Sequence, residues 1–340
     1  MSSKKLKVLV TGGAGYIGSH TTHQLVEAGH RVTVVDNLYS GHRWAVPADA
    51  EFVEADAGDR SKMLALMSDA SFDAVIHFAG HIVVPESVAN PDKYYRNNVL
   101  GSLNLIDSAA ACGIGMFIFS SSAAVYGNPT YIPVSETAPL SPINPYGRTK
   151  LITEWTLQDM AQRDLQPNPL RYVALRYFNV AGAHLDGRLG QATPEATHLI
   201  KVACETACGK RDLVSIFGTD YDTPDGTCIR DYIHVQDLAD AHLKALDYLA
   251  TGGESRVLNC GYGHGYSVRE VLDTVRLVNG ADFPMSEASR RAGDPAQLVA
   301  DNRAIRETLG WAPRYDNLEI ICETALRWER NGNRPLFKTS

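Results

Sequence analysis

Short apolar runs alternate with longer amphipathic stretches along the first half of the chain. The apolar runs are nearly continuous and rich in β-branched or aromatic residues, which is typical of parallel strands covered on both faces. We expect strands at Leu6–Val10, Val32–Val35, Ala74–Phe78, Met116–Phe119 and Val173–Tyr177. We expect helices near Gly15–Ala28, Ser61–Met67, Asn98–Cys112 and Tyr146–Gln162. This alternation predicts an α/β fold with a doubly wound parallel sheet.

The pattern changes after about residue 180. Loops lengthen, and Gly and Pro become frequent over residues 182–194 and 218–226. We therefore predict a first domain over residues 1–180 and a smaller mixed α/β domain over residues 181–340. Segments near 233–260 are expected to return to the first domain.

Composition narrows the class of partner. The 340 residues are 44% hydrophobic and 21% charged, as in ordinary globular proteins, and the net charge is −7. A negative chain disfavours nucleic acids and anionic membranes, and no apolar run reaches the ~18 residues of a membrane span. The six cysteines form no C-x-x-C pair and the 11 histidines no H-E-x-x-H motif, so no metal site is predicted. Reduced thiols and the lack of a secretory pattern predict a cytoplasmic protein.

A glycine loop follows the first predicted strand and opens the first predicted helix. Its glycines are Gly12, Gly15 and Gly18. Without side chains, the backbone can approach a pyrophosphate, and the helix N-terminus favours the negative charge. The pattern predicts a Rossmann domain that binds a dinucleotide.

Acidic residues at strand ends indicate which dinucleotide binds. Asp36 ends the second strand, where its carboxylate would accept hydrogen bonds from ribose hydroxyls and repel a 2′-phosphate. This favours NAD over NADP. Asp56, after the strand Glu51–Glu54, could reach the adenine amino group, and Asn97 is either a cofactor contact or a helix N-cap. Further cofactor contacts are predicted at Tyr16, Ile17, Asn37, Ala57, Phe78, Ala79, Gly80, Ser120 and Phe178.

Three residues could supply proton-transfer chemistry. Tyr146 and Lys150 stand four apart after Pro145, so they share one helix face. A tyrosine pKa near 10 is too high for a base at neutral pH, but a nearby ammonium and a positive nicotinamide would favour the phenolate. Ser122 ends a predicted strand, at the edge where Rossmann folds bind ligands. Alone, Y-x-x-x-K is a weak motif; with the glycine loop and the serine, it predicts a catalytic set that also contacts cofactor and substrate.

The glycine loop, the serine run and the Tyr146/Lys150 pair resemble the extended short-chain dehydrogenase/reductase family. Longer stretches resemble its UDP-glucose 4-epimerase branch across essentially the whole chain. These stretches are Val10–His20, Asp36–Leu38, His77–Gly80, Pro85–Val88, Asn144–Lys150, Leu175–Gly182 and Gly218–Asp240. The resemblance implies NAD as a retained cofactor and a homodimer formed through the helices near Asn98–Cys112 and Tyr146–Gln162.

The resemblance also implies a reaction, the reversible inversion of C4 of a UDP-hexose (UDP-glucose or UDP-galactose) through a transient 4-keto sugar. It implies that Tyr146 takes the 4-hydroxyl proton, Ser122 hydrogen-bonds the reacting oxygen, and Lys150 binds the nicotinamide ribose. The pathway would be galactose metabolism or supply of UDP-galactose for surface polysaccharide. The substrate-binding residues implied are Asn179, His198, Leu199, Phe217, Arg230, Arg291, Asp294 and Leu298.

Three of this chain's residues depart from the pattern of the branch. Ile82 stands near the nicotinamide where several members have lysine. His198 stands where asparagine is common, and a cationic imidazole there would make UDP-sugar affinity depend on pH. Leu298 stands where a larger residue restricts the pocket and a smaller one admits N-acetyl-hexosamines. UDP-GlcNAc and UDP-pentoses therefore remain alternative substrates.

Other activities fit the residues less well. A nucleotide-sugar 4,6-dehydratase needs an acid and a base beside the hydroxyl residue, and this chain has Ala123 and Ala124 after Ser122. A ketoreductase with exchangeable NADP is disfavoured by Asp36. A non-enzymatic NAD-sensing protein could lose Tyr146 and Lys150, which this chain retains.

Overall fold

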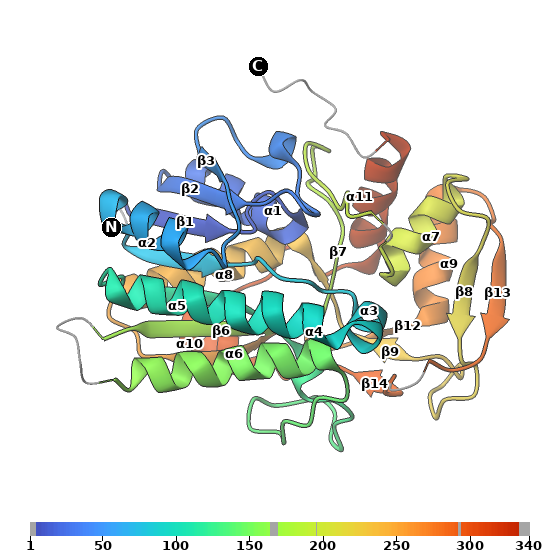
Figure 1. Ribbon diagram of the computed structural model, residues 1–340. Coiled ribbons are helices and arrows are strands. Elements are labelled where there is room, and N and C mark those ends of the chain that lie inside the picture. The colour runs from blue at the N-terminus through green and yellow to red at the C-terminus, as the bar shows by residue number, and fades with distance from the viewer. Residues whose placement is uncertain (1–4, 164–168, 195, 292–293, 333–340) are drawn as a thin grey trace.

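A computed structural model describes residues 5–163, 169–194, 196–291 and 294–332, and its centre is a parallel sheet (Figure 1). Within these ranges, the sheet has seven strands in the order β11-β6-β5-β4-β1-β2-β3, and every neighbouring pair is parallel. The strands are β1 (Lys7–Thr11), β2 (Arg31–Asp36), β3 (Glu51–Glu54), β4 (Ala74–His77), β5 (Met116–Ser122), β6 (Arg171–Tyr177) and β11 (Arg256–Cys260). The strand order reverses between β1 and β4, which confirms the predicted doubly wound sheet.

Helices cover both faces of this sheet. One face carries α1 (Tyr16–Glu27) and α8 (Val235–Ala250). The other carries α2 (Arg60–Ala70), α5 (Gly101–Ala111) and α6 (Pro145–Ala161).

The alternation of side chains along β1 explains why both faces are apolar. Val8 and Val10 pack in one core with Leu25 of α1, whereas Leu9 points into the other core with Leu105 of α5. All five side chains are fully buried. Truncating one of the leucines to alanine would cost about 2–5 kcal/mol.

A smaller mixed unit follows β6 and lies at one end of the sheet (Figure 1). Its strands pair as β10–β7, β12–β9–β14 and β13–β8, and α7, α9 and α11 pack against one another. Its elements are β7 (Asn179–Ala181), α7 (Leu199–Ala207), β8 (Val214–Phe217), β9 (Ile229–Arg230), β10 (Tyr232–His234), β12 (Tyr266–Ser267), α9 (Val268–Asn279), β13 (Met285–Ala288), β14 (Gln297–Leu298) and α11 (Leu318–Arg330). Helix α10 (Arg303–Leu309) instead packs against α8 and β11 of the large sheet. This confirms the predicted fold class.

The chain between β4 and α5 differs from the expected single helix near Asn98–Cys112. It forms α3 (Val84–Ala89), α4 (Pro91–Tyr94) and a π-helical turn η2 (Tyr95–Leu100), and α5 begins only at Gly101. Asn97 therefore lies inside a helical segment and is not an N-cap residue. Asn98 is buried and bonds both the backbone N and O of His81, at 2.8 and 2.9 Å. The wider π turn lets Asn97 line a cavity while Asn98 keeps these bonds.

Short 3₁₀ turns complete the described chain at η1 (Arg43–Ala45) and η3 (Ala123–Val125). No helix in the described ranges has the length and apolarity to cross a membrane. All six cysteines are free thiols. The described residues also contain no cluster of three or more His, Cys, Asp or Glu side chains that could hold a metal ion.

Candidate active site

The carboxyl ends of β1, β4, β5 and β6 face one cavity of 990 Å³. It begins at the glycine loop after β1 and extends to Arg230, Arg291 and Asp294 in the smaller unit. A crevice at this edge of a doubly wound sheet, beside its switch point, is where such folds bind ligands.

The glycine loop leaves room for a diphosphate. Gly12 has φ +72°, and a Cβ on Gly18 would lie 2.2 Å from the Gly12 oxygen, so neither position tolerates a side chain. A Cβ on Gly15 would meet only that same oxygen, at 3.3 Å, and would otherwise enter the cavity. No side chain caps α1, so its first N–H groups are free to bind an anion. This loop fits the pyrophosphate of NAD.

Asp36 lies at the same end of the cavity as the glycine loop. Its two carboxylate oxygens accept hydrogen bonds from the backbone N of Ala14 at 3.0 Å and of Leu38 at 2.8 Å. Burial raises the pKa of Asp36, and these two bonds oppose the rise. Each oxygen keeps a lone pair that ribose hydroxyls could use. Tyr16, Ile17, Asn37, Asp56 and Ala57 line this end as well.

The middle of the cavity is lined by residues from the ends of β4, β5 and β6. Ser120 faces Tyr177, and their hydroxyl oxygens are in contact. The predicted cofactor residues gathered here are Phe78, Ala79, Gly80, Asn97, Ser120 and Phe178. The exposed Ile82 lies beside them.

Helix α6 brings Tyr146 and Lys150 together. Asn144 caps the helix, its side chain accepting from the Gly147 N at 2.8 Å, and Pro145 occupies the first turn. The Lys150 Nζ lies 5.8 Å from the centre of the Tyr146 ring and donates to the Ser120 carbonyl at 2.7 Å. Lys150 is buried behind the cavity wall, and its burial lowers its pKa to about 8.

Tyr146 and Ser122 both line the cavity. Burial raises the pKa of Tyr146, and the neighbouring Ser122 hydroxyl opposes that rise. Among the protein's own groups, burial has the largest effect on this pKa. A fall in the pKa of Tyr146 requires a further positive charge, which a nicotinamide would bring.

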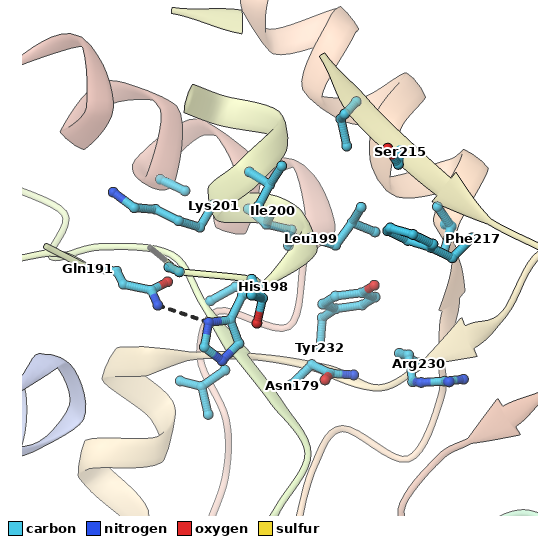
Figure 2. Close-up of a pocket in the computed structure, with 18 of the residues that line it drawn as sticks. Asn179, Gln191, His198, Leu199, Ile200, Lys201, Ser215, Phe217, Arg230 and Tyr232 are labelled. Atoms are coloured by element: carbon cyan, nitrogen blue, oxygen red, sulfur yellow. Dashed lines mark hydrogen bonds between the residues drawn. The ribbon is translucent and has the colours of Figure 1, made fainter. Parts of the chain in front are cut away.

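The residues predicted to bind substrate lie in two adjoining cavities, and Figure 2 shows the smaller one. Leu199 and Phe217 line a second cavity of 380 Å³, and Leu298 lines the large one. Both cavities share Asn179, His198, Arg230, Arg291 and Asp294.

Charge in this region favours an anion. The Arg291 guanidinium lies 3.8 Å from the centre of the Phe217 ring, and Arg230 lies 3.5 Å from an oxygen of Asp294. This region thus contains two guanidinium groups and one carboxylate. A guanidinium group can donate two parallel hydrogen bonds, which matches the oxygens of a diphosphate. The flat Phe217 ring next to them could pack against a uracil base.

Sequence reasoning missed Gln191 and Tyr177, which also line the large cavity. Neither belongs to a motif. The signal for Tyr177 was its place at the end of a predicted strand, next to Phe178. Gln191 lies in a Gly-rich segment and carries no signal of its own.

The fold and this arrangement define a dinucleotide-dependent enzyme of the α/β class. The chain belongs to the NAD dependent epimerase/dehydratase family, whose sequence profile matches residues 8–261.

Individual relatives are similar over nearly the full length. The chain is 56% identical over 325 residues to a UDP-glucose 4-epimerase of Azospirillum brasilense, covering 96% of this chain and 92% of the relative. It is 46% identical to a Brucella ovis UDP-glucose 4-epimerase solved in complex with NAD, with a TM-score of 0.92 and coverage of 96% and 98%. It is 51% identical to the UDP-Glc/GlcNAc 4-epimerase of Campylobacter jejuni, with a TM-score of 0.84 and coverage of 96% and 99%.

These comparisons confirm the resemblance on which the sequence analysis relied. They also confirm the predicted cofactor, NAD, and the predicted class of enzyme, an epimerase.

Proposed function

We propose that the protein interconverts UDP-glucose and UDP-galactose by reversible inversion at C4, with NAD as a retained cofactor. The observation that carries the proposal is the continuity of the cavities. One end offers Tyr146 and Ser122 beside a dinucleotide loop, and the other offers Arg230 and Arg291 beside an aromatic ring. A nucleoside diphosphate bound by the arginines would reach toward Tyr146 with its sugar.

The glycine loop and the Asp36 carboxylate would hold NAD at the sheet edge, with Asp56 near the adenine. Small residues at Ala79 and Gly80 leave space for the cofactor to pass. When bound, NAD supplies a reversible hydride acceptor.

The chain's own groups manage the proton and the orientation of the sugar. The Tyr146 phenolate oxygen takes the proton of the C4 hydroxyl and returns it after the sugar has presented its other face. Ser122 holds the reacting oxygen. Lys150, fixed by the Ser120 carbonyl, would stabilise the phenolate form of Tyr146 that accepts this proton.

A second candidate substrate is UDP-GlcNAc. Leu298 lines the large cavity and is only half-buried, so it leaves space beside the sugar position. The Campylobacter jejuni relative is named for both UDP-Glc and UDP-GlcNAc. UDP-pentoses are smaller and would fit the same space.

We also propose how the chain is organised. Residues 1–180, with α8 and β11 returning at 235–260, would form the NAD-binding domain, and the rest of 181–340 the UDP-sugar-binding domain. A homodimer would form through α5, the end of η2 that precedes it, and α6, because Leu100, Leu103 and Trp155 are about half exposed there. Free cysteines fit a reducing compartment, and we place the protein in the cytoplasm.

The test is turnover without added cofactor. Purified protein is mixed separately with UDP-glucose, UDP-GlcNAc and UDP-xylose, and the products are followed by NMR. A 4-epimer formed from UDP-glucose without added NAD supports both the reaction and the retained cofactor. Turnover of UDP-xylose alone would mean that the substrate is a UDP-pentose and not a UDP-hexose. Absence of any product, even with NAD supplied, would refute the proposal.

A further inference from the structure

Gln191 connects the two cavities and is held firmly. It lies between β7 and α7, is 7% exposed, and its backbone oxygen accepts a hydrogen bond from the indole N–H of Trp328 at 3.2 Å. Its side-chain Nε2 lies 3.0 Å from the Nδ1 of His198 (Figure 2). The backbone bond and the burial fix the amide in position against the imidazole.

His198 immediately precedes α7 and is exposed to both cavities. Its Nδ1 faces Gln191, while its Nε2 has no hydrogen-bond partner among the described residues. The surrounding protein lowers the pKa of His198, because it removes part of the water around the charged ring. At neutral pH the ring is therefore uncharged and carries one proton, on one of its two nitrogens.

The charged groups around His198 do not favour a cation. Arg230, Arg291, Lys201 and Arg211 line the same cavities. Asp36 and Asp56 line the cofactor end of the large cavity; of the two carboxylates at the substrate end, Asp294 pairs with Arg230, and Glu329 pairs with Lys201 and Lys210. Neither carboxylate bonds to His198 in the described part of the chain. Without a ligand, these groups therefore do not favour the cationic His198 on which the expected change of affinity between pH 6 and 8 depends.

We propose that Gln191 is a positioning residue that holds His198 in its Nε2–H tautomer, so that the ring donates a hydrogen bond to the diphosphate of a UDP-sugar. The argument rests on the proposed function for the identity of the ligand. An amide N–H donated to Nδ1 occupies that lone pair and leaves the proton on Nε2. The Nε2–H group of His198, a residue that lines both cavities, is then a hydrogen-bond donor. A diphosphate needs such a donor because its oxygens only accept hydrogen bonds. A carboxylate at position 191 could only accept, and would favour the doubly protonated ring instead.

The tautomer is measured directly on holoprotein labelled with ¹⁵N-histidine, with UDP bound. We expect His198 to show a protonated Nε2 and an unprotonated Nδ1, and the signal is assigned by its loss in His198→Gln. In Gln191→Glu both nitrogens should be protonated near neutral pH. A protonated Nδ1 in the wild type would overturn the proposal.

Kinetics separates positioning from a structural role. Gln191→Met should raise the KM for UDP-glucose about fivefold, the worth of one oriented hydrogen bond, with the larger part of the effect on KM and not on kcat. In a His198→Gln background, the same substitution should not raise the KM for UDP-glucose any further. An equal rise in both backgrounds would mean that Gln191 acts through folding, which contradicts the proposal. The exposed Gln162→Met is the matched control.

The dependence of KM on pH provides a second test of the proposal. The wild-type KM should stay flat between pH 6 and 8, whereas the KM of Gln191→Glu should fall as pH decreases, because the imidazolium attracts the diphosphate. A wild-type protein that turns over no UDP-sugar would refute the proposed function, whereas the tautomer of the UDP-bound protein would still decide this inference.

Discussion

The cofactor end of the large cavity includes a backbone loop in which Gly12 and Gly18 leave no room for side chains, whereas the substrate end is lined by side chains of separate segments. The cofactor end comes from the contiguous loop over Gly12–Gly18 and from strand ends of one sheet. The substrate end gathers Asn179, His198, Arg230 and Asp294 from separate segments. A backbone site depends on the path of the chain, and a side-chain site depends on which residues stand at a few positions. The substrate can therefore change by substitution while the NAD site stays intact.

The largest expected effect lies where the two ends meet. Tyr146→Phe removes the proton acceptor and should lower kcat about 10³-fold, while NAD and UDP binding are retained. Turnover of UDP-glucose is followed by NMR, and bound NAD by its release on denaturation. Tyr131→Phe, at an 83% exposed position, serves as control. Full activity in Tyr146→Phe would show that Tyr146 is not the proton acceptor.

The second largest effect is expected from a substitution at the substrate end. Arg291→Gln should raise the KM for UDP-glucose about 30-fold, equivalent to about 2 kcal/mol, because a charged hydrogen bond to diphosphate is lost. Bound NAD should not change. The neighbouring Arg290 is exposed and pairs with Asp220, so Arg290→Gln is a matched control. Loss of NAD in Arg291→Gln would contradict the separation of the two ends.

Acid should weaken the contact between the two units. Burial lowers the pKa of His20 on α1 and of His234 at the start of α8 to about 3. Above pH 6.5 both are neutral whether folded or unfolded, so they do not affect stability. Below pH 6.5 only the unfolded chain gains protons, so stability falls as pH decreases toward 3, by about 2 kcal/mol per histidine at pH 5.

Chemical denaturation at pH 7 and pH 5 measures this loss. His20→Asn should reduce the difference between the two pH values, whereas the exposed His264→Asn should leave it unchanged. Equal pH dependence in all three proteins would show that His20 is not responsible.

The smallest effect is expected at the cofactor end. Asp36→Asn keeps the size of the side chain but loses acceptor capacity and charge, so NAD should bind about tenfold more weakly. Discrimination against NADP should fall at the same time. Calorimetric titration of NAD and NADP into cofactor-stripped protein measures both effects, with the exposed Asp49→Asn as control. Unchanged preference for NAD would show that Asp36 does not select the cofactor.

The same contrast explains what the sequence could predict. Gly12, Gly15, Gly18 and Asp36 follow one strand–helix–strand unit, so their chain positions already bring them together. The sheet and its helices follow from continuous apolar runs in the same way. The N-cap alternative for Asn97 was wrong because a π turn has no signature in the hydrophobic pattern.

At the substrate end the chain positions carry less information. Leu199, Phe217 and Arg291 were placed by resemblance, since distant segments assemble the cavity only after folding. Gln191 was not anticipated because its contact depends on the conformation of a loop. The sequence also does not reveal how deeply Tyr146 is buried, and this burial raises its pKa.

The sheet also has a consequence for synthesis on the ribosome. Its edge strand β11 pairs with β6, yet residues 178–255 separate the two in the chain. Until β11 has emerged, the newly made β6 presents an open hydrogen-bonding edge that other nascent chains can pair with. Translation that stops before residue 256 would therefore release an aggregation-prone fragment, and prompt folding depends on completing β11.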